Sequence, residues 1–195
     1  MRLTNHFLEE SELMEPYSYE IRTAIPSDAS GIIECMQSVM SEKIYLVSEV
    51  YLYTERGQKE ILRNPDDLNL VTVFRREVVG TMNIQRGIYK KNRHTANLGI
   101  AIKKEHRGKG FGSEMINRGI RWCREEGIVK LNLEVFSSNE DAIRLYEKLG
   151  FKIEGSRKGQ FLVDEKYVDD VMMTVYPMEH LDDVGKTNLS HGMDH

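Results

Sequence analysis

Polar and apolar residues alternate along several short stretches of the chain, and in other stretches apolar residues recur three and four positions apart. Alternation is typical of half-buried strands, and the longer spacing is typical of helices with one buried face. The alternating stretches predict strands at residues 19–25, 70–74, 78–85, 97–102, 129–136, 151–161 and 167–176. The second pattern predicts a helix that begins near residue 26 and further helices at residues 55–63, 113–126 and 139–149.

In chain order these elements are a strand, two helices, three strands, a helix, a strand, a helix and two strands. This order predicts a mixed α/β fold of the α+β type, in which helices flank a mostly antiparallel sheet of about six to seven strands. Short turn segments separate the second strand from the third and the sixth from the seventh, so each of these pairs is predicted to form a hairpin.

Residues with strong capping preferences mark the ends of the predicted helices. Ser27 or Asp28 can cap the first helix, because a side-chain oxygen there accepts a free N–H group. Gly127 and Gly150 end the two later helices. The segment at residues 41–54 mixes acidic residues and tyrosines without a clear period, so its structure is not predicted.

The length of 195 residues matches one domain. We predict an N-terminal arm at residues 1–18, a single domain at residues 19–178 and a mobile polar tail at residues 179–195. The first residues include several acids and no long apolar run, and no stretch is long enough to span a bilayer. We therefore expect neither a signal peptide nor a membrane segment, and a cytoplasmic location.

Hydrophobic residues make up 40% of the chain and charged residues 30%, which is enough apolar material for a packed core. The 27 basic and 31 acidic residues give a formal net charge of −4. Because such a chain lacks the basic surplus of nucleic-acid-binding proteins, we expect no nucleic-acid partner. The two cysteines, Cys35 and Cys123, lie far apart without metal-ligand spacing, so we predict reduced thiols and no metal site.

One glycine-rich segment, Arg107-Gly108-Lys109-Gly110-Phe111-Gly112, joins a predicted strand to a predicted helix. Glycines let a backbone turn tightly near a ligand, and the first N–H groups of a helix attract anions. Arg107 and Lys109 add positive charge there. The P-loop and dinucleotide-binding patterns require other spacings, so neither motif is present. The segment is interpreted as a phosphate-binding turn, the alternative being a glycine-rich turn without a ligand.

The spacing R-x-x-G-x-G after a strand resembles the pyrophosphate-binding signature of the GCN5-related N-acetyltransferase (GNAT) family. A second segment, SNEDAIRLYEKLGF at residues 138–151, resembles the second signature of that family and follows the next predicted strand. The resemblance extends over residues 19–178, nearly the whole chain. Gly159-Gln160-Phe161 and the strand at residues 167–172 resemble the branch that acts on small molecules and ribosomal proteins.

This resemblance implies a GNAT-like fold and acetyl-CoA as the co-substrate. Backbone amides of residues 107–112 would surround the pyrophosphate, the strand end at residues 100–102 would pair with the pantetheine arm, and Asn139 would hydrogen-bond that arm. The implied cofactor-binding residues are therefore Ile100, Ala101, Ile102, Arg107, Gly108, Lys109, Gly110, Phe111, Gly112, Ser113 and Asn139.

The resemblance also places Tyr146 near the thioester sulfur. A tyrosine has an ordinary pKa of about 10, so it is protonated at neutral pH and can give its proton to a departing thiolate. We predict Tyr146 as the catalytic acid, the alternative being an aromatic side chain that only packs. Backbone N–H groups near Ile102 would stabilise the developing oxyanion.

The general base is predicted to be Glu134, acting directly or through a water molecule. Glu134 shares one strand face with Lys130 and Asn132, so the alternative is an ordinary solvent-facing side chain. Some members of the family use ordered water in place of a dedicated base.

The predicted function is an N-acetyltransferase whose acceptor is a primary amine of a small molecule, such as a polyamine or an amino acid. Acids and tyrosines lie where the family builds its acceptor site, and this combination suits a cationic amine; the alternative is an exposed face with a few packed tyrosines. These residues are Glu42, Tyr45, Glu49, Tyr51, Tyr53 and Glu55.

Two other functions stay open, namely acetylation of a protein N-terminus or lysine and non-catalytic binding of an acyl-CoA. The presence of Tyr146 favours catalysis over binding alone. A homodimer is also expected, since the final hairpin offers an exposed strand edge that needs a partner.

Overall fold

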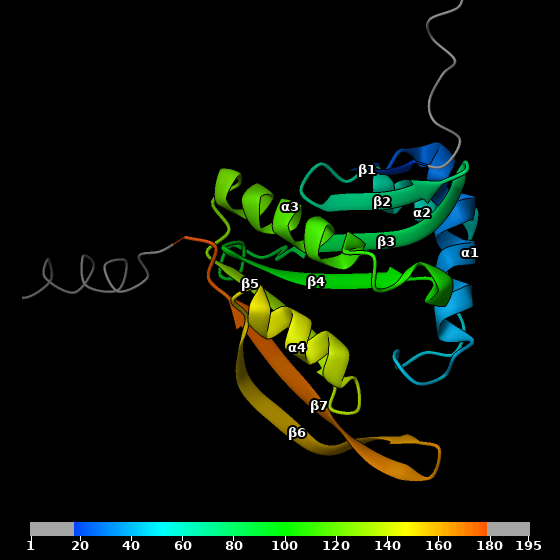
Figure 1. The fold of residues 1–195 in the computed structure, drawn as a ribbon. Coiled ribbons are helices and arrows are strands. Elements are labelled where there is room, and N and C mark those ends of the chain that lie inside the picture. The colour runs from blue at the N-terminus through cyan, green and yellow to red at the C-terminus, as the bar shows by residue number, and fades with distance from the viewer. Residues whose placement is uncertain (1–17, 179–195) are drawn as a thin grey trace, which may run out of the picture.

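The computed structural model describes residues 18–178, so the predicted polar tail and all but the last residue of the predicted arm lie outside the described residues. Seven strands form one sheet (Figure 1). They are β1 (Tyr19–Thr23), β2 (Leu68–Phe74), β3 (Glu77–Arg86), β4 (Thr95–Ile102), β5 (Lys130–Phe136), β6 (Lys152–Val163) and β7 (Lys166–Val175). Across the sheet the order is β1-β2-β3-β4-β5-β7-β6.

All neighbouring strands in this sheet are antiparallel except β4 and β5, which are parallel. The predicted fold class and both predicted hairpins, β2–β3 and β6–β7, are therefore confirmed. The longer hairpin turns at Asp164 and Glu165, which have positive φ angles of 46° and 61°. The chain runs from β4 through a helix to β5, which is the crossover that a parallel pair requires.

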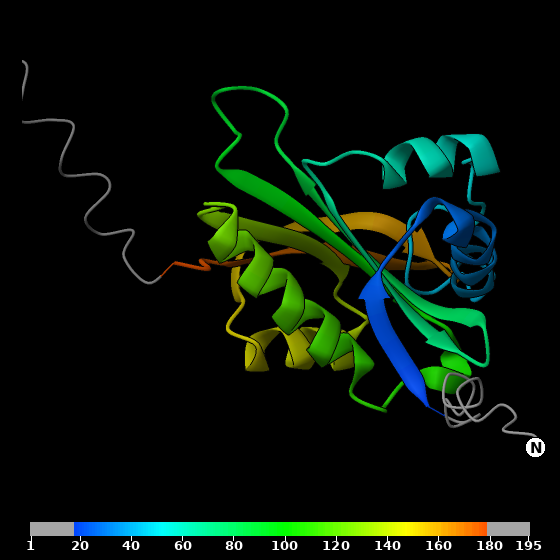
Figure 2. The same ribbon diagram turned by 90° about the horizontal axis from the view of Figure 1, so that it is seen from above.

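Four α-helices cover the two faces of the sheet (Figure 2). α1 (Ala29–Met40) and α2 (Glu55–Leu62) lie on one face, and α3 (Phe111–Glu125) and α4 (Glu140–Lys148) lie on the other. Short 3-10 helices, η1 (Pro26–Asp28) and η2 (Lys104–His106), precede α1 and follow β4. The apolar positions at helical spacing thus face the sheet, as the sequence predicts.

The start of α1 differs in detail from the expected cap. Asp28 occupies the N-cap position but makes no side-chain cap hydrogen bond to the helix. Its carboxylate instead accepts the N–H of Ile25 at 2.8 Å and binds Arg22 at 2.7 Å and 2.9 Å. The guanidinium of Arg22 therefore lowers the pKa of Asp28 below its ordinary value. Asp28 is therefore at the predicted N-cap position, but its carboxylate stabilises the connection between β1 and α1 and does not cap the helix N–H groups.

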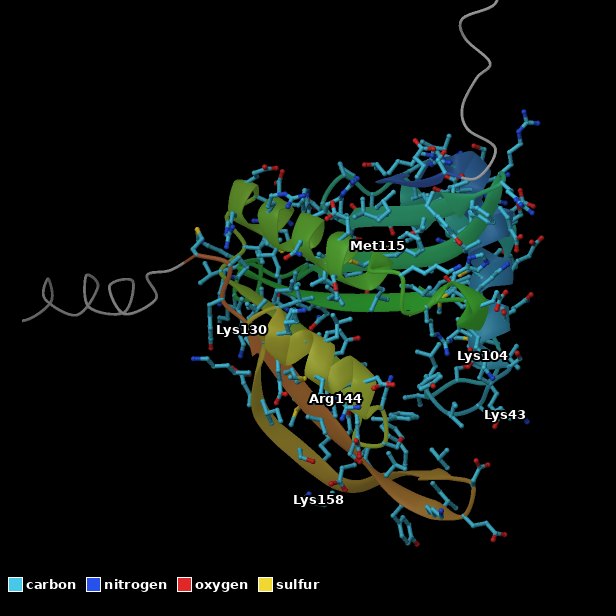
Figure 3. All side chains as sticks on the ribbon, in the orientation of Figure 1. Lys43, Lys104, Met115, Lys130, Arg144 and Lys158 are labelled. Atoms are coloured by element: carbon cyan, nitrogen blue, oxygen red, sulfur yellow. The ribbon has the colours of Figure 1, made fainter. Side chains whose placement is uncertain are left out.

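Two apolar clusters hold the layers together. The larger one lies between the sheet and the α3–α4 face and includes Met82, Met115 and Leu131, none of which is more than 1% exposed. Met115 lies on the sheet side of α3 (Figure 3), where its sulfur accepts a hydrogen bond from the Thr72 hydroxyl at 3.2 Å. The smaller cluster lies under α1 and comprises Ala24, Ile32, Cys35, Val71 and Val78.

Gly119 illustrates how closely α3 approaches the sheet. A Cβ atom at this position would lie 2.6 Å from Cδ1 of Ile84 and 3.1 Å from Cε of Met82. We expect Gly119→Val to lower the free energy of unfolding by about 1–3 kcal/mol, because overfilling a packed core forces side chains off their rotamers. Thermal unfolding would then occur about 2–4 °C lower per kcal/mol. Asn117→Val, on the exposed side of the same helix, is the control and should leave the midpoint nearly unchanged.

Candidate active site

The parallel strands β4 and β5 stay together for only a short distance. Their register pairs are Thr95 with Lys130, Ala96 with Leu131 and Asn97 with Asn132. β4 then continues to Ile102 and β5 continues to Phe136 without further pairing between them. The two strands therefore separate toward their carboxyl ends, and each presents one unpaired backbone edge to the gap.

The hydrogen bonds at the two ends of β4 show which backbone groups point into this gap. The N–H of Lys103 bonds to the carbonyl of Val79 at 2.9 Å, and the N–H of Gly87 bonds to the carbonyl of Thr95 at 3.0 Å. In an antiparallel pair, alternate residues bond to the partner strand. The odd-numbered residues of β4 therefore bond to β3, and the even-numbered residues face away from it.

This alternation divides the three strand residues that the sequence assigns to the pantetheine arm. Ile100 and Ile102 direct their backbone groups into the gap, whereas Ala101 directs its groups toward β3. The carbonyl of Ile102 already accepts a hydrogen bond from Nε of Arg107 at 2.8 Å. The backbone of Ile100 and the N–H of Ile102 are thus the groups best placed to bind an extended ligand.

A cavity of about 550 Å³ begins where the two strands separate. Polar side chains on the sheet face opposite α3 and α4 form much of its wall, and Glu134 and Glu154 contribute carboxylates. Its lining residues are Asn97, Leu98, Asn132, Leu133, Glu134, Glu154, Met172, Met173 and Thr174. The gap between the strands therefore leads to a cavity with both polar and apolar walls on the other face of the sheet.

The glycine-rich segment forms the turn between β4 and α3. Gly108 and Gly110 have positive φ angles of 73° and 86°, and a Cβ atom built at either position meets no atom within 4 Å. Gly110 is the N-cap of α3, so the N–H groups of the first helical residues have no acceptor within the helix. The space beside the turn is open, and its donors suit a phosphate group.

Three other residues of this segment, Lys109, Phe111 and Gly112, contact other parts of the protein. A Cβ atom on Gly112 would lie 3.4 Å from Leu145, so this glycine also allows α3 to approach α4. The ring of Phe111 lies 4.3 Å from that of Tyr19, and the ammonium of Lys109 donates to the Tyr19 hydroxyl at 2.8 Å. The helix-start residue Ser113 is half-buried.

The guanidinium of Arg107 does not point to the open space beside the turn. It donates two hydrogen bonds to the carboxylate of Glu42, one of them at 2.9 Å, and lies 4.8 Å from the ring centre of Tyr45. Sequence reasoning placed the charge of Arg107 with the phosphate, but the side chain reaches the segment between α1 and α2. The backbone of the turn is left as its main anion-binding element.

Tyr146 lies on α4 and is only 8% exposed. Burial raises the pKa of its hydroxyl to about 12, because the charged phenolate would lose its hydration. The ring also packs 5.8 Å from the ring of Phe151. Asn139 caps the same helix, with its side-chain oxygen accepting the N–H of Ala142 at 3.3 Å. The hydroxyl of Tyr146 therefore stays protonated throughout the physiological pH range.

Glu134 lines the cavity with a side chain that is 57% exposed. Its carboxylate accepts a hydrogen bond from Arg157 of β6 at 3.0 Å. Arg157 also binds Asp170 of β7 at 2.5 Å, and Asp170 is only 2% exposed. Glu134 therefore belongs to a charged group of three side chains on three neighbouring strands.

Sequence reasoning did not identify Arg157, Asp170 or Glu154, because the strands that carry them are distant in the chain. β5 offered part of the signal, because its alternation places Asn132 and Glu134 on one face. β7 is less regular, since its register places Met172 beside Glu134 and Thr174 beside Asn132. The hydroxyl of Thr174 donates to the side chain of Asn132 at 2.8 Å.

The acetyltransferase (GNAT) family profile matches residues 33–151, which include the turn, the gap and α4. The chain belongs to this family. It is similar to the L-amino acid N-acetyltransferase AaaT of Escherichia coli, at 32% identity over 60% of this chain and 72% of the relative. It is also similar to the spermidine N(1)-acetyltransferase of Vibrio cholerae, at 33% identity over 45% of this chain and 51% of the relative.

Solved structures agree with this GNAT assignment. A GNAT acetyltransferase from Streptococcus pneumoniae matches with a TM-score of 0.77 and 28% identity, over 82% of this chain and 99% of the other. An acetyltransferase from Salmonella typhimurium, solved with its cofactor acetyl-CoA, has the same fold, with a TM-score of 0.75 at 20% identity over 84% of this chain and 96% of the other. The protein is thus a GNAT N-acetyltransferase.

Within residues 18–178, no helix combines the length and the apolar character needed to cross a membrane. The same residues contain no group of three His, Cys, Asp or Glu side chains that would hold a metal ion.

Proposed function

We propose that this GNAT protein transfers the acetyl group of acetyl-CoA to the primary amine of a small cationic molecule. The observation that carries the proposal is the gap between β4 and β5, which connects an open, N–H-rich turn to a cavity that holds two carboxylates. The turn fits a pyrophosphate, since side chains would fill its open space at Gly108 and Gly110 and glycines do not.

The backbone of β4 would hold the pantetheine arm and the thioester. The N–H groups of Ile100 and Ile102 point into the gap, where one of them would donate to the thioester oxygen as negative charge develops on it. Holding the amine and the thioester side by side supplies a large part of the rate acceleration.

The reaction forms one C–N bond and breaks one C–S bond. The acceptor's ammonium first gives a proton to Glu134, or to a water molecule bound to it, so that a neutral amine nitrogen attacks the carbonyl carbon. The C–S bonding electrons leave on sulfur, and the second proton of the nitrogen passes to water. Tyr146 would donate a hydrogen bond to the departing sulfur and supply the proton of the thiol, and the tyrosinate would then regain a proton from water.

The charges around the cavity favour an acceptor that is cationic and has no carboxylate. Glu134 and Glu154 line the cavity, where Arg157 pairs with Glu134 and Asp170, and Lys130 pairs with Glu154 at 2.7 Å. Three carboxylates and two cations leave one net negative charge at the cavity. The second ammonium of a diamine would compensate that charge. An amino acid would bring its own carboxylate next to these acids, and like charges repel.

Two acceptors that differ only in a carboxylate test this preference. We expect 1,5-diaminopentane to be acetylated with a kcat/KM at least ~10-fold above that of lysine, because about 1.4 kcal/mol of repulsion changes a rate ratio tenfold. Release of free thiol from acetyl-CoA measures both rates. Equal rates, or faster turnover of lysine, would contradict the proposed acceptor class.

Binding of acetyl-CoA is tested separately by thermal unfolding, since a ligand of the native state raises the melting temperature. A rise together with thiol release on diamines supports the whole proposal. A rise without release on any small amine would favour a protein acceptor or a non-catalytic binding protein. No rise would contradict the proposed acetyl-CoA site.

A further inference from the structure

The link between Arg107 and Glu42 joins two parts of the protein that are 65 residues apart in the chain. Arg107 begins the glycine-rich turn, and Glu42 is the second residue of the 41–54 loop between α1 and α2. The contact is bidentate, the third donor of Arg107 binds the carbonyl of Ile102 at 2.8 Å, and Tyr45 of the loop covers the guanidinium face. One side chain therefore connects the end of β4, the turn and the loop.

The position of Glu42 is unfavourable without this partner. Glu42 follows the C-terminus of α1, and its N–H bonds to the carbonyl of Val39 at 3.2 Å. A negative charge at the carboxyl end of a helix is repelled by the helix dipole, and α1 has no basic residue in its last turn. The Glu42 side chain is also only 17% exposed. The positive charge of Arg107 offsets the repulsion between the Glu42 carboxylate and the dipole of α1. It also offsets the hydration that this carboxylate loses on partial burial.

The 41–54 loop lies beside the carboxyl end of β4, where Arg107 joins it to Ile102, the residue whose N–H would bind the thioester oxygen. Figure 3 labels Lys43 on this loop and Lys104 just beyond β4, both on the same side. The pKa of Lys43 is raised, mainly by its hydrogen bond to Glu49 and to a smaller extent by Asp164 at the β6–β7 turn. This loop therefore approaches the tip of the β6–β7 hairpin. Its far end is secured separately, where Tyr51 donates to Gln58 at 2.6 Å.

We propose that Arg107 and Glu42 act as a pair of positioning residues that hold the 41–54 loop against the end of β4, so that the pair governs acceptor binding and not pyrophosphate binding. This inference rests on the proposed function. It differs from what the charge of Arg107 in a phosphate-binding turn suggests, because the guanidinium contacts Glu42, Tyr45 and Ile102, which lie in the loop and at the strand end. Removing either partner frees the loop but leaves the backbone amides of the turn in place.

Steady-state kinetics and acetyl-CoA binding of Arg107→Gln, Glu42→Gln and the double variant test the pair. We expect each single variant to raise the KM of the acceptor about 10-fold, while the Kd of acetyl-CoA changes less than about threefold. The double variant should resemble each single variant, because residues that act through one contact are not additive. Arg107→Lys should not restore the acceptor KM, since an ammonium cannot make the bidentate contact.

Arg63→Gln is the matched control, because Arg63, the C-cap of α2, forms an exposed ion pair with Glu60 at 2.8 Å. This variant should leave the KM of the acceptor and the Kd of acetyl-CoA unchanged. The inference is overturned if Arg107→Gln weakens acetyl-CoA binding strongly while Glu42→Gln does not, or if both variants only lower the melting temperature. If the wild-type protein neither binds acetyl-CoA nor turns over any amine, the proposed function itself has failed.

Discussion

Gly110→Glu removes acetyl-CoA binding while the protein remains folded. Gly110 has a φ of 86°, and the space around its missing Cβ is open. A glutamate there projects into the space assigned to the pyrophosphate. At an effective dielectric constant of about 20, two charges 4 Å apart repel by about 4 kcal/mol. A loss of 2.7 kcal/mol already weakens binding about 100-fold, so we expect at least this increase in Kd.

Two controls separate charge from backbone strain. Gly110→Gln has the same shape and the same unfavourable φ without the charge, and should weaken binding less than Gly110→Glu. Gly127→Glu places the same side chain at the other end of α3, where φ is 67° and the space is also open. It should lose a similar amount of stability and bind acetyl-CoA normally. If Gly110→Glu binds as tightly as the parent in isothermal titration, the pyrophosphate lies elsewhere.

Much of the fold follows from local patterns in the sequence. β5 alternates up to its last residue, with Leu131, Leu133 and Val135 on the helix side and Lys130, Asn132 and Glu134 on the other, so its two faces were predictable. α3 combines an apolar face with a glycine at each end, and its limits were predicted within about two residues. The two hairpins also follow, because short turns join β2 to β3 and β6 to β7. The position of β7 between β5 and β6 does not follow from a local pattern.

The site was predictable only where its function depends on the backbone. Gly108 and Gly110 are identified by their type, since few other residues adopt a positive φ. The side chain of Arg107 is different, because its partner Glu42 is 65 positions earlier in a segment without periodicity. Likewise, the polar wall of the cavity arises from pairing among β5, β6 and β7, and sequence spacing alone does not specify which charges meet.

Tyr146→Phe separates the chemical role of this residue from its role in packing. Phenylalanine keeps the ring against Phe151 and removes only the hydroxyl. We expect kcat to fall about 100-fold, the lower end of the range for a lost general acid, and the Kd of acetyl-CoA to stay unchanged. The lower end applies because a hydroxyl with a pKa of about 12 is a weak acid toward a thiolate of ordinary pKa near 8.5.

The pH dependence gives a second and independent readout. Since the folded pKa of Tyr146 is about 12 and the ordinary value is 10.0, the hydroxyl is protonated in both states below pH 10. Its contribution to stability is complete there and is lost as the pH rises toward 12, by roughly 3 kcal/mol in all. Between pH 10 and 12, the free energy of unfolding of Tyr146→Phe should therefore fall less than that of the parent. Below pH 10, the plots of kcat against pH should have the same shape for both proteins. Full turnover by the variant would leave Tyr146 as a packing residue, and the proton of the leaving thiol would then come from water.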